Sequence, residues 1–235
     1  MIEKLPKYVS ALIPIILSLS IVYDFGYFSS LGLSFSDIPT TISDHLRSSI
    51  VWLPTALICI FFISIIELFT RRLEQGMTEE EIINNSSNPQ RTAKIRKSPF
   101  YFITAITVSI PIVYLFGVKI PVVAWQFFWI ITWFLLHDFI FGHQRIASQI
   151  TKEYSLLIRW IPAVILWVLF SGYLAGEQDK GAGNSLATIT TESVVLEKVI
   201  LRAYDKFYLL YSPDDEIITI LSSGSVLSID SAPQK

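Results

Sequence analysis

The chain has 235 residues, of which 52% are hydrophobic and only 16% are charged, whereas soluble domains carry about 25% charged residues. This length suits one membrane unit with a small appendage, and the shortage of charge argues against an ordinary soluble enzyme. The formal net charge of -2 does not predict a partner, because the two signs are segregated along the chain. The single cysteine, Cys59, excludes a disulfide framework or a cysteine-based zinc site within one chain.

Five stretches of low charge approach or exceed the roughly 20 apolar residues needed to cross a hydrocarbon core about 30 Å thick. They cover residues 8–28, 50–69, 100–118, 120–141 and 156–174. A backbone inside lipid must satisfy its own hydrogen bonds, so these stretches are predicted to be helices. Interior prolines such as Pro14 and Pro111 predict kinks that neighbouring helices accommodate.

The Lys and Arg residues of the short loops predict the orientation in the membrane. Alternate loops are basic, and the loop of residues 71–98 holds the largest share of the cations. The basic side is the cytoplasmic one, so the N-terminus is predicted to lie inside the cell and, with five spans, the C-terminal domain outside. One miscounted span would move that domain into the cytoplasm. We expect a multi-pass protein of the inner (plasma) membrane.

The sequence pattern changes near the C-terminus. Residues 177–187, EQDKGAGNSLA, predict a linker between a transmembrane domain of residues 1–176 and a soluble domain of residues 188–235. Short β-branched and aromatic runs then lie at 193–204, 207–211, 216–221 and 226–229. They predict four or five antiparallel strands, in a small SH3-like or Sm-like barrel or a simple meander. The predicted fold class is a membrane all-α helical bundle with a small all-β domain.

A basic cluster, RTAKIRK, lies directly before the third predicted span. Its cations are Arg91, Lys94, Arg96 and Lys97. Such clusters attract anionic lipid headgroups, at about 1 kcal/mol per residue near the surface, and they also set membrane orientation or dock a cytoplasmic partner. Because no aromatic residue is interleaved with these cations, we expect no nucleic-acid partner.

Ionisable residues inside predicted spans are candidates for intramembrane function. Glu67 lies near the inner end of the second span, and His137 and Asp138 lie near the inner end of the fourth. His143 follows His137 at a spacing that does not share a helix face, and no zinc-protease motif accompanies these residues. Two interpretations of these residues therefore stay open: structural roles at the membrane interface, or a metal site or proton relay.

Polar and charged residues on the predicted outer side are expected to have structural roles. Asp24 is expected to be a boundary residue at the end of the first span. Ser43 or Asp44 is expected to cap a helix that leads into the second span. Arg202, Asp205 and Lys206 are expected to be solvated turn charges.

The sequence holds no phosphate-binding glycine loop, nucleophile elbow or zinc-ligand cluster, and no motif identifies a cofactor or a small-molecule ligand. It favours a non-enzymatic membrane sensor or anchor subunit, a layout that occurs in bacterial multi-protein defence and stress systems. We expect contacts with the lipid bilayer and with a second copy or a protein partner. Two alternatives stay open: an oligomeric channel or permeabilising effector gated by the β domain, and an integral enzyme or transporter that uses Glu67, His137, Asp138 or His143.

Overall fold

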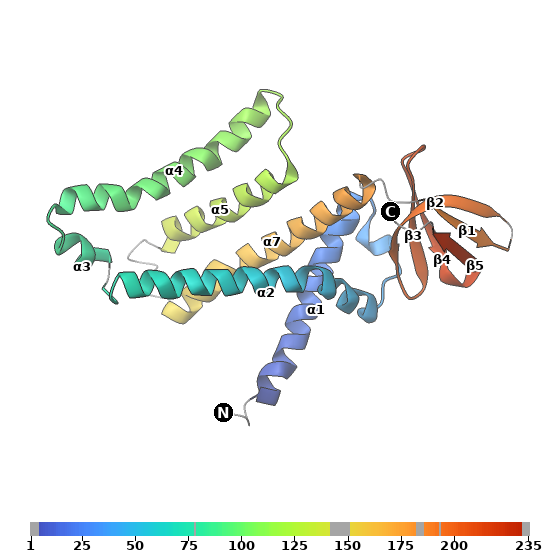
Figure 1. The fold of residues 1–235 in the computed structure, drawn as a ribbon, viewed down its shortest axis with the longest axis horizontal. Coiled ribbons are helices and arrows are strands. Elements are labelled where there is room, and N and C mark those ends of the chain that lie inside the picture. Colours follow the sequence, from blue (N-terminus) through green and yellow to red (C-terminus); the bar gives the residue numbers. More distant parts are fainter. Residues whose placement is uncertain (1–4, 78, 142–150, 182–185, 193, 232–235) are drawn as a thin grey trace. The chain divides into compact units, whose positions relative to one another are not determined.

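The structure is a computed structural model that describes residues 5–77, 79–141, 151–181, 186–192 and 194–231. It divides into two compact units. The first unit contains residues 1–52 and 168–235, and the second contains residues 53–167. The helices lie in both units, whereas the strands all belong to the C-terminal part of the first unit (Figure 1).

Five helices are long and apolar enough to cross a membrane, by length and composition. They are α1 (Leu5–Ser30), α2 (Ile42–Leu73), α4 (Pro89–Leu115), α5 (Val122–Phe141) and α7 (Lys152–Gly181). A short helix, α3 (Glu79–Asn84), precedes α4. The prediction of five long apolar helices is therefore confirmed. The helix α1 continues through Pro14, and α4 continues through Pro99 and Pro111.

The cap of α2 lies two or three residues before the predicted one. Thr41 and Asp44 form a capping box: the N–H of Asp44 donates to Oγ1 of Thr41 at 3.3 Å, and the N–H of Thr41 donates to the Asp44 carboxylate at 2.9 Å. Thr41 therefore caps α2, rather than Ser43 or Asp44. Asp44 instead occupies the third helical position, from which its side chain reaches back to the cap.

The end of α7 also lies further along the chain than the fifth predicted span. This helix continues to Gly181, so five residues of the segment interpreted as a linker are helical. EQDKG contains helix-forming Glu, Gln and Lys, and a helix continues through such residues when its neighbours support it.

In the second unit, α4 and α5 lie side by side as a hairpin (Figure 1). The turn between them passes through Gly117, whose φ of 79° favours glycine because it has no Cβ. The rings of Tyr114 and Trp125 meet edge to face across the hairpin, with centroids 5.4 Å apart. Large apolar side chains elsewhere on these helices are exposed, including Phe102 at 68% and Phe139 at 83%.

Five strands form one antiparallel sheet in the order β4-β3-β2-β1-β5 (Figure 1). They are β1 (Ala187–Thr191), β2 (Val195–Ala203), β3 (Phe207–Ser212), β4 (Ile217–Ser222) and β5 (Val226–Ser231). The prediction of four or five antiparallel strands is confirmed, and four of the predicted runs correspond to β2 to β5. The sequence pattern does not predict β1, because ATITT follows a glycine-rich stretch and contains only one large apolar residue.

The sheet shares a hydrophobic core with the end of α1. Buried Leu209 and Phe207 of β3 belong to the same cluster as Tyr27 and Phe28 of α1 and Ile38 of the following loop. A smaller cluster within the sheet contains Ala187, Ile189 and Leu210. The sheet is therefore part of a unit that includes the first 52 residues, and this packing brings residues of α1, α2 and β2 together.

Candidate functional site

A buried carboxylate from α1 lies at the centre of a polar cluster in the first unit. Asp24 is fully buried. The Nδ1 atom of His45 lies 2.6 Å from its Oδ2, and the Ser48 hydroxyl donates to its Oδ1 at 2.6 Å. Nη1 of Arg202 donates to the same Oδ1 at 3.2 Å. Because an unpaired buried charge costs several kcal/mol, these contacts hold α1, the start of α2 and β2 together.

Arg202 supplies the positive charge of this cluster, and its side chain is 15% exposed. Its guanidinium carbon lies 3.6 Å from the ring centroid of Tyr27 and 5.3 Å from that of Tyr23. Burial would lower the pKa of the guanidinium, but the phenol oxygens around it and the Asp24 carboxylate raise that pKa above its ordinary value. Arg202 therefore stays charged, and both its Coulomb partner and its aromatic contacts come from α1.

A second set of contacts joins the start of α2 to the turn after β2. The buried Asp44 carboxylate accepts a hydrogen bond from the N–H of Asp205 at 3.0 Å. The Ser43 hydroxyl donates to the Asp205 carboxylate, and Nη1 of Arg47 donates to the carbonyl of Ala203 at 3.2 Å. One end of α2 thus holds the end of β2 and the turn that follows it.

The backbones of α1 and α7 touch at glycines. A Cβ at Gly26 would overlap the carbonyl oxygen of Leu169, and a Cβ at Gly172 would overlap the carbonyl oxygen of Tyr23. Gly172 and Gly176 are four residues apart, which is the spacing of small residues at close helix–helix interfaces. Glycines on both helices therefore permit the close approach, and this contact fixes the position of Asp24 along the axis of α7.

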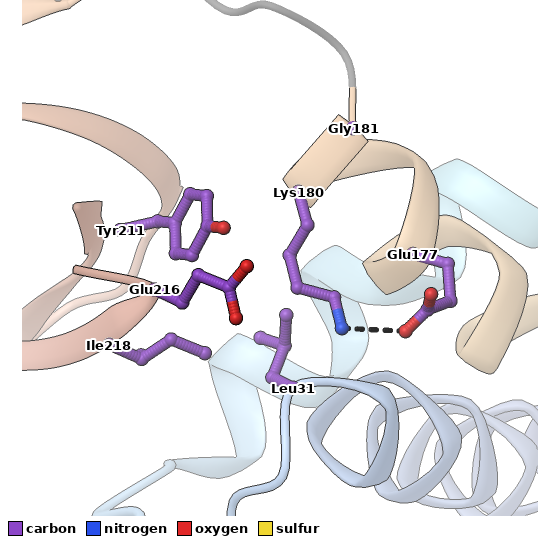
Figure 2. A pocket seen from close by; sticks show the side chains of 7 residues that line it. All are labelled: Leu31, Glu177, Lys180, Gly181, Tyr211, Glu216 and Ile218. Atoms are coloured by element: carbon purple, nitrogen blue, oxygen red, sulfur yellow. Dashed lines mark ion pairs between the residues drawn. The ribbon is translucent and has the colours of Figure 1, made fainter. Parts of the chain in front are cut away.

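A pocket of about 340 Å³ lies where the ends of α1 and α7 meet the β3–β4 hairpin, near the lower end of the roughly 300–1,000 Å³ typical of small-molecule sites. Its lining residues are Leu31, Glu177, Lys180, Gly181, Tyr211, Glu216 and Ile218 (Figure 2). Nζ of Lys180 pairs with Glu177 at 2.6 Å and donates to the carbonyl of Ser30 at 2.7 Å. Figure 2 shows Tyr211 and Glu216 on the side opposite Lys180. A molecule in this pocket would touch both helices and the sheet.

The predicted intramembrane residues His137 and Asp138 both lie on α5. His137 is buried, with Nε2 3.3 Å from the carbonyl of Ser155 and its ring stacked on Phe141 at 4.6 Å. Asp138 is half exposed and lies 3.5 Å from Arg159 of α7. These contacts join α5 to α7. Across the described residues, no three His, Cys, Asp or Glu side chains are grouped so as to hold a metal ion.

The structure does not describe the side chains of two other candidate residues. His143 and the side chain of Glu67 lie outside the described residues, so their predicted intramembrane roles stay predictions. The basic cluster lies in the first turns of α4 and divides into two parts. Nη2 of Arg96 donates to Oε1 of Glu74 at 2.9 Å, whereas the other three cations, at 91, 94 and 97, are exposed.

The structure corrects the interpretation of Asp24, Arg202 and Asp205. Asp24 is the centre of a buried cluster, which its interpretation as a simple boundary residue did not include, and the other two contact α1 and α2 rather than solvent alone. A register shift between Ile200 and Arg202 interrupts the two-residue alternation of β2, so the sequence pattern cannot predict where Arg202 points. In the sequence, the one feature that indicates a buried cationic partner is the position of Asp24 as an isolated acidic residue within an apolar run.

The arrangement around Asp24 is that of a satisfied buried ion cluster. Nδ1 of His45 and the Ser48 hydroxyl both contact the Asp24 carboxylate, and among the described residues the Ser48 hydroxyl donates to this carboxylate rather than to the imidazole. No protein-family model, curated protein or solved structure is significantly similar to the chain.

Proposed function

We propose that the protein is a multi-pass inner-membrane sensor or anchor subunit without enzymatic activity, in which the Asp24–Arg202 pair couples the C-terminal sheet to the membrane helices. The sheet and the loops would receive a signal or a partner, and the ion cluster would pass its effect to α1 and α2. The buried contact between Asp24 and Arg202, at 3.2 Å, carries the proposal.

Exposed apolar surface supports the membrane location. Phe61 of α2, Phe102 of α4 and Phe139 of α5 are 62%, 68% and 83% exposed. Soluble proteins rarely leave extended apolar surface uncovered, whereas lipid covers such helices and their backbones satisfy their own hydrogen bonds. The inside location of the N-terminus and the outside location of the sheet follow from the loop charges and belong to the same proposal.

The connection between the edge strands supports a curled, SH3-like sheet as the receiving element. In a flat sheet, strands spaced about 4.8 Å apart would separate β4 from β5 by about 19 Å. Only the 3₁₀ turn Ser223–Ser225 joins these two strands, and a link of this length spans at most about 14 Å. The sheet must therefore curl toward a partly open barrel, which leaves its loops and outer edges for a partner.

Coupling follows from the energetics of the buried pair. Withdrawing one member of a buried ion pair leaves the other uncompensated, at a cost of about 3–5 kcal/mol. A displacement of β2 that moves Arg202 away from Asp24 therefore also disturbs His45 and Ser48 of α2. By the same argument, a change in the helices alters the position of the sheet.

Hydrogen–deuterium exchange of the purified full chain tests the coupling. We expect R202Q to raise exchange in residues 20–31 of α1 and its loop and in residues 42–52 of α2. R159Q removes an arginine from a half-exposed ion pair with Asp138 and should leave these segments unchanged. If R202Q affects the sheet alone, the coupling is rejected. A reporter fused after residue 235 tests the proposed outside location of the sheet independently.

A further inference from the structure

We propose that Arg91, Lys94 and Lys97 of α4 bind the headgroups of anionic phospholipids. The proposal rests on the membrane location argued above and names the class of lipid that this face selects. All three side chains are exposed, and none pairs with an acidic side chain among the residues that the structure describes. The three charges are therefore free to bind a ligand.

The three cations lie on one side of α4. In an α-helix each residue turns by about 100° and rises by about 1.5 Å, so positions three apart differ by about 60°. Arg91, Lys94 and Lys97 thus cover about 120° of the helix circumference over an axial rise of about 9 Å. This makes a continuous positive face at the beginning of the helix.

Arg96 belongs to the same sequence cluster but not to this face. It follows Lys94 by two residues and therefore lies about 160° away around the helix. There its guanidinium donates to Glu74 at 2.9 Å, and both side chains are about one third exposed. The structure thus separates three free cations from one paired cation, a distinction that the sequence cluster alone does not make.

Aromatic side chains come after the three cations along α4, at the position expected for the membrane interface. Tyr101 comes seven residues after Lys94, so it lies on the same side of α4 about 10 Å further along the axis. It is 63% exposed, and Phe100 and Phe102 beside it are 50% and 68% exposed. No charged residue follows until Lys119. Tyr and Trp are enriched at the membrane–water interface, so Tyr101 places this part of α4 at that interface, and the preceding cations then lie on its aqueous side within reach of the lipid phosphates.

The chemistry of this face favours a phospholipid over a soluble acidic partner. Phosphate oxygens bind both guanidinium and ammonium groups through charge-assisted hydrogen bonds. The start of α4 carries no acidic residue in its first turn, and the helix dipole adds partial positive charge there. A phospholipid also supplies acyl chains that cover Phe100 and Phe102, which a soluble acidic molecule does not.

Native mass spectrometry of the purified full chain tests the proposal. The protein is released from micelles that contain equal amounts of phosphatidylglycerol and phosphatidylcholine, so its orientation in a membrane does not affect the result. We expect the wild-type chain to retain phosphatidylglycerol preferentially. The triple variant R91Q/K94Q/K97Q should lose this preference at least about tenfold, since each cation near a headgroup contributes to the attraction.

Two controls make the test specific. R96Q removes one positive charge from the same sequence cluster but from the opposite side of α4, so it should leave the preference unchanged. The variant R91K keeps the charge and should also keep the preference. Circular dichroism confirms that the triple variant retains its helices.

A wild-type chain without a preference for phosphatidylglycerol overturns the proposal, and so does a triple variant that keeps the preference. An acidic protein as the true occupant of this face would give the first of these results. Failure of the membrane location is separately visible, because alkaline carbonate would then extract the chain from cell membranes. A chain that resists extraction but shows no lipid preference rejects the lipid site alone.

Discussion

Arg202 of β2 lies 3.2 Å from Asp24 of α1, 178 residues earlier in the chain. This pair joins the last third of the sequence to the first helix, and His45 and Ser48 bring α2 to the same carboxylate. The sheet is thus connected to two helices through one buried charge. This connection is the basis of the first prediction.

Neutralising either member of the pair should destabilise the first unit, because the remaining charge stays buried without its partner. We expect D24N and R202Q each to lower the free energy of unfolding by about 3–5 kcal/mol. The double variant should lose much less than the sum of the two, since neither charge is then left alone. Thermal unfolding of the purified chain in detergent measures all three.

R47Q is the matched control for this cycle, since Arg47 is exposed and, among the described residues, its hydrogen bond goes to the carbonyl of Ala203. It should change the stability by less than about 1 kcal/mol. Additive losses in the double variant would show that Asp24 and Arg202 do not act as a pair.

The contact between α1 and α7 predicts a second effect. In G172A the new methyl group would meet the carbonyl oxygen of Tyr23, so the helices must move apart. We expect a loss of stability of about 1–3 kcal/mol or more, as in other overpacked interfaces. G181A adds the same group at the end of α7, where nothing lies within 4 Å, and should be neutral. Equal melting temperatures for the two variants would contradict the close approach.

The five long helices could be predicted because each corresponds to a continuous apolar run of sufficient length in the local sequence. Strands β2 to β5 were predictable for a similar reason. The pairing of Asp24 with Arg202 was not, because it depends on which face of β2 meets α1 and on an irregularity in the strand register. Pairing of Arg96 with Glu74 likewise depends on the path of residues 75–88 between them.

The capping box at the start of α2 predicts a local effect. T41A removes the hydroxyl that accepts from the N–H of Asp44, and loss of such a cap typically costs about 0.5–2 kcal/mol. Because Asp44 also holds Asp205, the turn after β2 should show faster hydrogen exchange in this variant. T40A, one residue earlier, has no cap to remove. A T41A chain with unchanged exchange in both segments would argue against the capping box.

Two tryptophans on one face of α5 allow a matched test of the contact between α5 and α7. Nε1 of Trp133 donates to the carbonyl of Arg159 at 2.9 Å, whereas Trp129 is 48% exposed. W133F keeps an aromatic ring but removes the donor. We expect it to lower the free energy of unfolding by about 0.6 kcal/mol, the average for hydrogen bonds between membrane helices, and by no more than about 1.7 kcal/mol, their maximum. W129F should change stability less, because its ring faces the surroundings. Tryptophan fluorescence during unfolding in detergent compares the two variants, and a W133F chain as stable as the wild type would show that the α5–α7 hydrogen bond contributes nothing.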